Sequence, residues 1–138
     1  MRSTGAQVAP LTISVVVVED SVLFQTVLMQ LLDNSGDDTL PSFVVSVIVG
    51  RGDEARKLAP SPAPDVVLLD VNLPDCSGLE LIEPLREKWP RAEFVILTFN
   101  DYPQIRAQAA RAGASGFVSK TDAYDELVPA ILKTVQYS

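Results

Sequence analysis

Short hydrophobic runs alternate with longer amphipathic segments along this chain. The runs are rich in valine, isoleucine and phenylalanine, which favours β-strands, and they cover residues 12–18, 43–49, 66–69, 94–97 and 116–119. The run at 66–69 contains no polar residue, as is typical of a strand that is covered on both faces. Between the runs, apolar residues recur at helical spacing, and the predicted helices cover residues 21–33, 51–59, 77–89, 103–111 and 122–135.

This regular alternation of strand and helix predicts an α/β fold of the (βα)5 type. We expect a doubly wound, parallel five-stranded sheet with the flavodoxin-like strand order 2-1-3-4-5. Residues 1–10 contain Gly, Ser and Thr without an apolar core and predict a flexible tail, so the domain is expected over residues 11–138. Pro84 falls inside the helix at 77–89, which should bend or break there. Asn100, Asp101 and Asp122 are expected to cap the last two helices.

Polar side chains follow four of the predicted strands at the point where each strand ends. Glu19 and Asp20 follow the first strand, Asp70 the third, Thr98 the fourth and Lys120 the fifth. In open α/β sheets, ligands bind at the carboxyl ends of the strands, so these groups are expected to meet. Carboxylates so close together repel one another and need a cation, and their oxygen ligands suit Mg²⁺.

These residues, in this order, resemble the response-regulator receiver domain of two-component systems. The resemblance covers residues 11–136. The separations are 50 residues from Asp20 to Asp70, 28 from Asp70 to Thr98 and 22 from Thr98 to Lys120. The segment 112–123, with Thr121 after Lys120, is similar to the NarL/FixJ (LuxR-type) branch.

The resemblance implies phosphorelay signalling, in which a sensor histidine kinase donates a phosphoryl group to Asp70. It also implies a Mg²⁺ ion that is bound by Asp20, Asp70 and the backbone carbonyl of Asn72, with Glu19 supporting it through water. The product would be an aspartyl phosphate. Such a domain is not an enzyme in the usual sense, since at most it phosphorylates and dephosphorylates itself.

Three further residues match the switch positions of the family. The resemblance implies that Lys120 pairs with Asp70 and then with the phosphoryl group, that Thr98 hydrogen-bonds a phosphoryl oxygen, and that Phe117 is the switch aromatic. An ordinary core role for Phe117 is the alternative. The residue after Thr98 is usually small in the family, but here it is Phe99. We predict that this ring gates the entry of donor and water.

The output of the domain follows from the branch that it resembles. Members typically regulate transcription through a DNA-binding domain that follows the receiver, and such a domain is absent from this chain. A protein target and a homodimer are the other partners that the resemblance allows. The alternative is a stand-alone or phosphorylation-independent receiver that acts as a protein-binding module.

Two other classes fit the sequence less well. A haloacid-dehalogenase-type phosphatase needs a second aspartate two residues after the nucleophile, where this chain has Asn72. A flavin-binding module needs a phosphate loop after the first strand, where Glu19 and Asp20 would repel phosphate.

Composition limits the partners and the cellular location that can be expected for the domain. The net charge of −7 and pI of about 4.4 argue against nucleic-acid binding by this chain itself. The chain has no histidine, so it cannot be the histidine phosphodonor. One cysteine, no secretory signal and no membrane-spanning run predict a cytoplasmic protein.

Overall fold

The sheet has the predicted architecture. A computed structural model describes residues 12–33 and 39–135 of the chain, and the predicted N-terminal tail lies outside them. Five parallel strands form one sheet in the order β2-β1-β3-β4-β5, which confirms the predicted fold. The strands are β1 (Thr12–Val18), β2 (Ser42–Val49), β3 (Val66–Asp70), β4 (Glu93–Thr98) and β5 (Gly116–Ser119).

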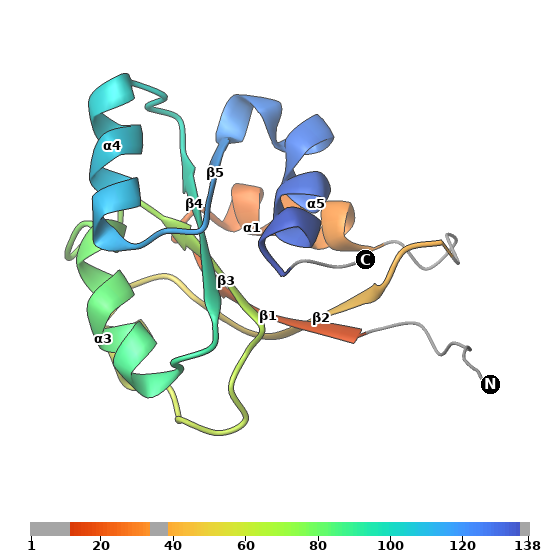
Figure 1. Ribbon diagram of the computed structural model, residues 1–138, viewed down its shortest axis with the longest axis horizontal. Coiled ribbons are helices and arrows are strands. Elements are labelled where there is room, and N and C mark those ends of the chain that lie inside the picture. The colour runs from red at the N-terminus through yellow and green to blue at the C-terminus, as the bar shows by residue number, and fades with distance from the viewer. Residues whose placement is uncertain (1–11, 34–38, 136–138) are drawn as a thin grey trace.

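Helices cover both faces of this sheet. They are α1 (Val22–Leu32), α2 (Gly52–Arg56), α3 (Ile82–Lys88), α4 (Pro103–Ala112) and α5 (Ala123–Thr134), with the short 3-10 helices η1 (Gly78–Leu81) and η2 (Lys120–Asp122). In Figure 1, α3 and α4 lie on one side of the strands and α1 and α5 on the other. Among the described residues, no helix has the length and apolar character that crossing a membrane requires.

The two faces of the sheet bury separate hydrophobic cores because successive strand residues point in opposite directions. Within β1, Val15 and Val17 pack toward α1 and α5, whereas Val16 and Val18 pack toward α3 and α4. Every residue of β3 is buried. The continuous apolar run that identified β3 in the sequence therefore reflects burial on both faces.

The predicted helix at 77–89 changes type before its proline rather than bending or breaking at it. It forms η1 and then α3, and Pro84 is the third residue of α3. A proline there loses no helical hydrogen bond, because the first N–H groups of a helix have no partner within it. The predicted cap of α4 is wrong: Tyr102 occupies the N-cap position, directly before Pro103. Asp122 is the N-cap of α5, but its side chain makes no capping hydrogen bond.

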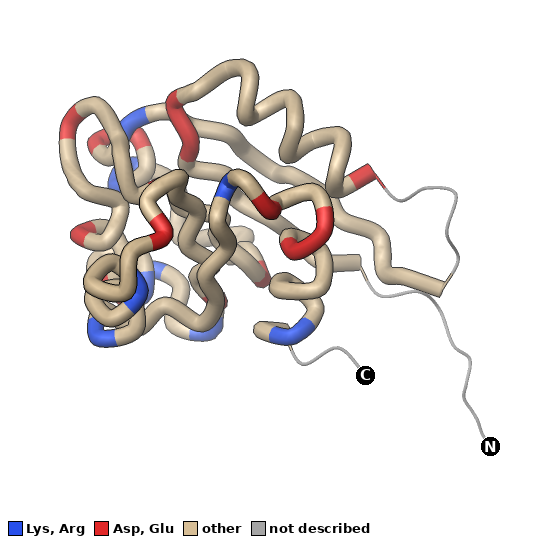
Figure 2. The backbone as a smooth tube through the Cα atoms, turned by 90° about the horizontal axis from the view of Figure 1, so that it is seen from above, with Lys and Arg blue, Asp and Glu red and all other residues tan. Residues whose placement is uncertain are grey.

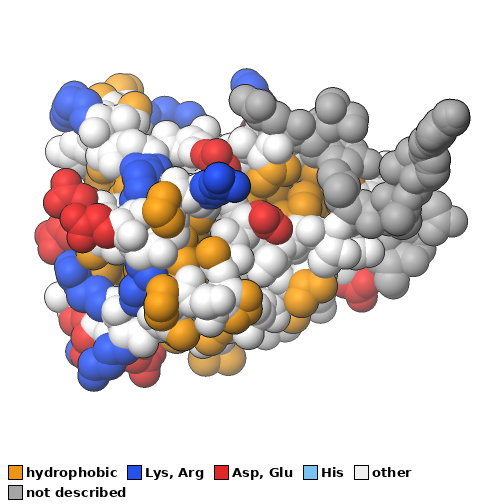
Figure 3. Space-filling model, turned by 60° about the horizontal axis from the view of Figure 1, so that its bottom comes forward, with side chains coloured by type: hydrophobic (Ala, Val, Ile, Leu, Met, Phe, Trp, Pro, Cys, Tyr) orange, Lys and Arg blue, Asp and Glu red, His pale blue; other side chains and the backbone are white. Residues whose placement is uncertain are grey.

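Charged residues lie mostly on the helices and loops (Figure 2), and acidic and basic side chains are interspersed on the face in Figure 3. Hydrophobic side chains are exposed between them. Several large ones lie near the carboxyl ends of the strands, at the start of α1, in the loop after β4 and at the start of α5. They are Val22, Leu23, Phe99, Tyr102 and Tyr124.

Candidate functional site

Four strand ends bring the predicted site residues together. Val18 pairs with Leu69 and Asp70 with Leu97 across neighbouring strands, so Asp70 and the residues that follow β1 lie at the same edge of the sheet. Thr98 pairs with Ser119, which places Lys120 one residue beyond that pair. Glu19, Asp70, Thr98 and Ser119 are buried polar side chains here, whereas Asp20 is exposed.

Lys120 forms ion pairs with two carboxylates. Its Nζ lies 2.7 Å from Oε1 of Glu19 and 3.2 Å from Oδ2 of Asp70, and 6% of its side chain is exposed. The pair with Asp70 is the one that the sequence predicted. The pair with Glu19 is closer than the pair with Asp70. The other carboxylate oxygen of Glu19, Oε2, accepts the backbone N–H of Ser21 at 3.0 Å.

The environment of Asp70 disfavours its charge. Its exposed fraction is 2%, and this burial raises its pKa from 3.8 to about 6. The negative charge of Glu19 adds to the rise in pKa, whereas the N–H of Asn72, which donates to Oδ1 at 3.0 Å, and the Lys120 ammonium act against it. Asp70 is therefore mainly a carboxylate at neutral pH, held in a site that would gain from an added cation.

The acidic cluster has the chemistry of a site for a hard cation. Glu19, Asp20 and Asp70 each present a carboxylate oxygen, and these oxygens lie within 4.8 Å of one another. Oε1 of Glu19 is buried and accepts no hydrogen bond of ordinary geometry from the described residues. Three carboxylates face one ammonium, so a divalent cation with oxygen ligands fits the charge and the donors.

The loop after β3 is held against Asp70 by close backbone packing. The N–H of Gly78 donates to the carbonyl of Val71 at 2.7 Å. A Cβ added at Gly78 would lie 1.9 Å from the carbonyl oxygen of Asp70, so this position requires glycine. The N–H of Leu73 donates to the carbonyl of Cys76 at 3.2 Å and closes the turn that carries Asn72.

Asp75 ties the same loop to α2, a contact that the sequence analysis missed. Its carboxylate accepts the backbone N–H groups of Gly52 at 2.8 Å and Asp53 at 2.9 Å. These two hydrogen bonds lower the pKa of Asp75 below its usual value. The donors are backbone groups more than 20 residues away in the chain, so no side-chain motif marks the contact.

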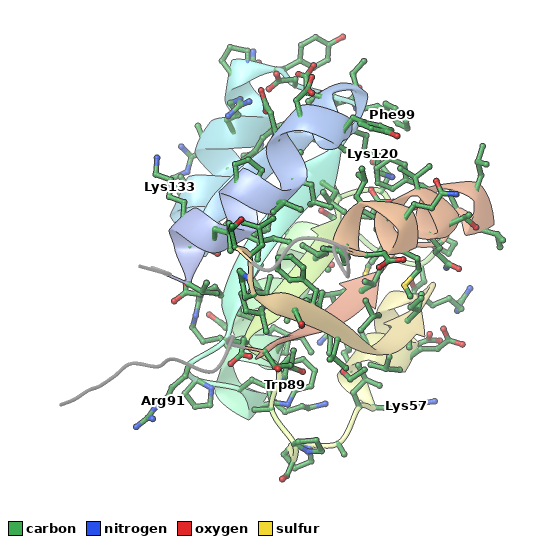
Figure 4. The ribbon with its side chains drawn as sticks, turned by 90° about the vertical axis from the view of Figure 1, so that its right-hand side faces the viewer. Lys57, Trp89, Arg91, Phe99, Lys120 and Lys133 are labelled. Carbon is green, nitrogen blue, oxygen red and sulfur yellow. The ribbon has the colours of Figure 1, made fainter. Side chains whose placement is uncertain are left out.

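Thr98 and Phe99 lie at the end of β4. The hydroxyl oxygen of Thr98 accepts the N–H of Asn100 at 3.0 Å. Phe99 is 66% exposed, yet its ring centroid lies 5.3 Å from Nζ of Lys120. Figure 4 shows both residues at the same end of the molecule. The predicted gate residue therefore lies beside the lysine of the site.

Phe117 lies on β5 and is half-buried. The guanidinium carbon of Arg106, on α4, lies 4.3 Å from the centroid of its ring. Arg106 also forms an ion pair with Asp101, with 2.6 Å between Nε and Oδ1. Phe117 thus connects β5 to α4 through Arg106.

A parallel five-stranded sheet with three acids, a threonine and a lysine at the carboxyl ends of its strands is the arrangement of a receiver-type α/β signalling domain. The family model described as response regulator receiver domain matches residues 15–132, and the chain belongs to this family. It is a receiver domain of a two-component response regulator.

Relatives and solved structures agree with this assignment. The chain is 33% identical to the transcriptional regulatory protein UhpA of Salmonella typhimurium over 119 residues, which are 86% of this chain and 57% of UhpA. It is 29% identical to the signal receiver domain of the putative response regulator NarL from Mycobacterium tuberculosis, with a TM-score of 0.80 over 94% of this chain and 100% of that one. The chain spans about half the length of the curated relatives that it matches.

One solved relative is described with a modified aspartate. A response regulator from Burkholderia pseudomallei, solved with a phosphorylated aspartic acid, a calcium ion and citrate, is 26% identical to this chain. The TM-score is 0.72, and the match covers 89% of this chain and 68% of that one. The match to LuxR-type regulators also supports the branch expected from segment 112–123.

Proposed function

We propose that this receiver domain accepts a phosphoryl group on Asp70 from the phosphohistidine of a sensor histidine kinase. The observation that carries the proposal is a buried carboxylate at the end of β3 that faces Lys120 at 3.2 Å and has two further acids beside it. The phosphorylated aspartic acid of the Burkholderia pseudomallei protein supports it by analogy.

The transfer is a displacement at phosphorus. An oxygen of Asp70 attacks the phosphorus atom, a P–O bond forms as the P–N bond of the phosphohistidine breaks, and the departing imidazole takes up a proton. Lys120 pairs with an oxygen of the transferred group. The hydroxyl of Thr98 uses its oxygen to accept from Asn100, so its proton is available to a phosphoryl oxygen.

A phosphate-affinity gel tests the acceptor. The wild type, incubated with MgCl₂ and acetyl phosphate, should give a slower band that builds up with time. Asp70→Asn should give none, because the amide is not a nucleophile. Glu87→Gln, an exposed carboxylate on α3, is the matched control and should behave as the wild type. A wild type that never shifts would refute phosphorylation by small donors.

The residues that would hold Mg²⁺ are Asp20, Asp70 and the carbonyl of Asn72, with Glu19 acting through water. When bound, the ion supplies positive charge that offsets the charge of the transferring oxygens. Calorimetric titration of the wild type with MgCl₂ should show binding, and Asp20→Ala should weaken it sharply. Asp20 is exposed, so its loss should leave the fold intact. Equal affinity in both proteins would count against the site.

Phe99 is proposed as a gate because its ring lies beside the lysine of the site. Removing its bulk in Phe99→Ala should speed phosphorylation by small donors and also speed loss of the phosphate to water. Both rates can be followed on the same gels with stopped time points. If the wild type stays unmodified while Phe99→Ala reacts, the alternative of a phosphorylation-independent, protein-binding receiver is favoured. Equal rates would refute the gate.

The proposed output is regulation of transcription in the cytoplasm, through a DNA-binding domain or another protein target. Relatives that share the receiver are named transcriptional regulators, which supports this step. The exposed hydrophobic residues around the site give a kinase or a second copy of the domain an apolar surface to contact. Sedimentation with and without acetyl phosphate and MgCl₂ tests whether phosphorylation produces a homodimer.

A further inference from the structure

The ammonium group of Lys120 lies against two aromatic rings as well as two carboxylates. Its Nζ lies 4.7 Å from the ring centroid of Phe24 and 5.3 Å from that of Phe99. The two rings contact each other edge to face, with 6.2 Å between centroids and 65° between planes. Glu19 and Asp70 supply the carboxylates. We call the two rings, Phe24 and Phe99, the aromatic cage.

The two rings differ in exposure. Phe24 lies on α1 and packs into the core that α1 and α5 share, with 9% exposed. Phe99 is 66% exposed and lies in the loop after β4. The inner ring is therefore fixed by the fold, whereas the outer ring covers the lysine on the side of solvent. This explains how Lys120 keeps only 6% exposure at the rim of the sheet.

A phenyl ring in this place has two separable properties. Its bulk excludes donor and water, and its face attracts the ammonium through the ring quadrupole within about 6 Å. Leucine keeps much of the bulk but has no such face. Tyrosine and tryptophan keep the face. The gate proposed above needs the bulk alone. Phe99→Ala loses both the bulk and the face, so its rate combines easier entry with a less well placed lysine, whereas Phe99→Leu and Phe99→Trp separate the two properties.

We propose that Phe24 and Phe99 are positioning residues that hold the Lys120 ammonium against Asp70, where it meets the transferred phosphoryl group. The inference rests on the proposed function of the site. Phe24, which had no predicted role, thereby helps to position the ammonium group of Lys120. The rings make no bond to the phosphoryl group and act through the lysine.

Nuclear magnetic resonance of the lysine side chains tests the placement without any phosphoryl transfer. The chain has four lysines, so protein labelled with ¹³C at the lysine ε-carbon gives a simple spectrum. The ε-methylene protons of Lys120 should be shifted upfield by the two rings. Lys57 and Lys133 are exposed and serve as unshifted references (Figure 4). Lys120→Arg assigns the signal.

The shift of Lys120 should shrink in Phe99→Leu and in Phe24→Leu and should persist in Phe99→Trp. Tyr124→Leu removes a ring that is 84% exposed at the start of α5 and should leave the shift unchanged. Thermal unfolding identifies any variant that fails to fold. Because Phe99 is exposed, its substitutions should leave the fold intact, so the Phe99 variants are the decisive ones. A Lys120 signal at the position of Lys57 in the wild type would overturn the cage.

Phosphorylation by acetyl phosphate gives the second readout. Phe99→Leu should react about three- to fivefold more slowly than the wild type, and Phe99→Trp should restore the rate. Equal rates for phenylalanine and leucine would overturn the positioning role and leave the gate. If the wild type accepts no phosphoryl group, the proposed function fails, while the lysine spectrum still decides whether the cage exists.

Discussion

Replacing Asp70 by asparagine should stabilise the metal-free protein at pH 7. Asp70 is 2% exposed, and its burial raises the pKa from 3.8 to about 6. The ionised carboxylate of Asp70 is therefore less stable in the folded protein than in the unfolded chain. At about 1.36 kcal/mol per pKa unit, the ionised Asp70 lowers the free energy of unfolding by about 3 kcal/mol when it is ionised in both the folded and the unfolded state. Asparagine has nearly the same shape and no charge, so it removes the penalty.

The pKa of about 6 already includes the opposing attraction of Lys120, which loses one of its two partners in the variant. Its closer partner, Glu19, stays at 2.7 Å. We expect the free energy of unfolding to rise by about 1–3 kcal/mol at pH 7. Glu87→Gln, the exposed control, should change it by less than about 0.5 kcal/mol.

The two proteins should also differ in how their free energy of unfolding changes with pH. Between pH 3.8 and about 6 the folded state of the wild type binds the Asp70 proton more readily than the unfolded state does. The wild type should therefore gain stability as the pH falls from 7 to 5, and Asp70→Asn should lack this gain. Urea unfolding in EDTA at both pH values measures it. Parallel pH profiles, or a variant less stable than the wild type at pH 7, would refute the reasoning.

Three further predictions concern the loop after β3 and the metal site. Gly78→Ala should lower the free energy of unfolding by about 3 kcal/mol, because its Cβ would lie 1.9 Å from the carbonyl oxygen of Asp70; urea unfolding that matches the wild type would be the contrary result. Asp75→Asn should destabilise the protein at pH 6, and the difference should close as the pH falls below 3.8, since the lowered pKa of Asp75 confines its contribution to higher pH. MgCl₂ should raise the melting temperature of the wild type more than that of Asp70→Asn, and equal shifts would count against Asp70 as a ligand.

The fold and the position of the site were predictable from the sequence for two physical reasons. A strand that is buried on both faces must be apolar throughout, so the run at 66–69 and its end at Asp70 are visible without coordinates. Parallel strands place their carboxyl ends together, which is why Asp70, Thr98 and Lys120 could be assigned to one edge of the sheet.

Side-chain partners were less predictable because they depend on reach and direction. The sequence indicated that Lys120 pairs with Asp70, but not that Glu19 would be closer. The sequence analysis gave Phe24 no role, and only its place opposite Phe99 distinguishes it. The Asp75 contact joins a side chain to backbone N–H groups, which carry no sequence signal.

Local helix ends were predicted with mixed success for a related reason. A proline marks a boundary but not the side on which the helix lies. Pro84 lies inside the first turn of α3, after the change from 3-10 helix to α-helix rather than at a kink. Asp101 has the side chain of a good cap, yet it pairs with Arg106 and leaves the N-cap position to Tyr102.

The most direct test of the central claim is to locate the phosphoryl group by mass spectrometry. Wild-type protein is treated with acetyl phosphate and MgCl₂, its intact mass is measured, and the modified peptide is identified after digestion. We predict the gain of a single phosphoryl group, carried by the peptide that contains Asp70, released by hydroxylamine as an acyl phosphate should be, and missing from Asp70→Asn. An adduct that persists in Asp70→Asn, or one that maps to another peptide, would contradict the account.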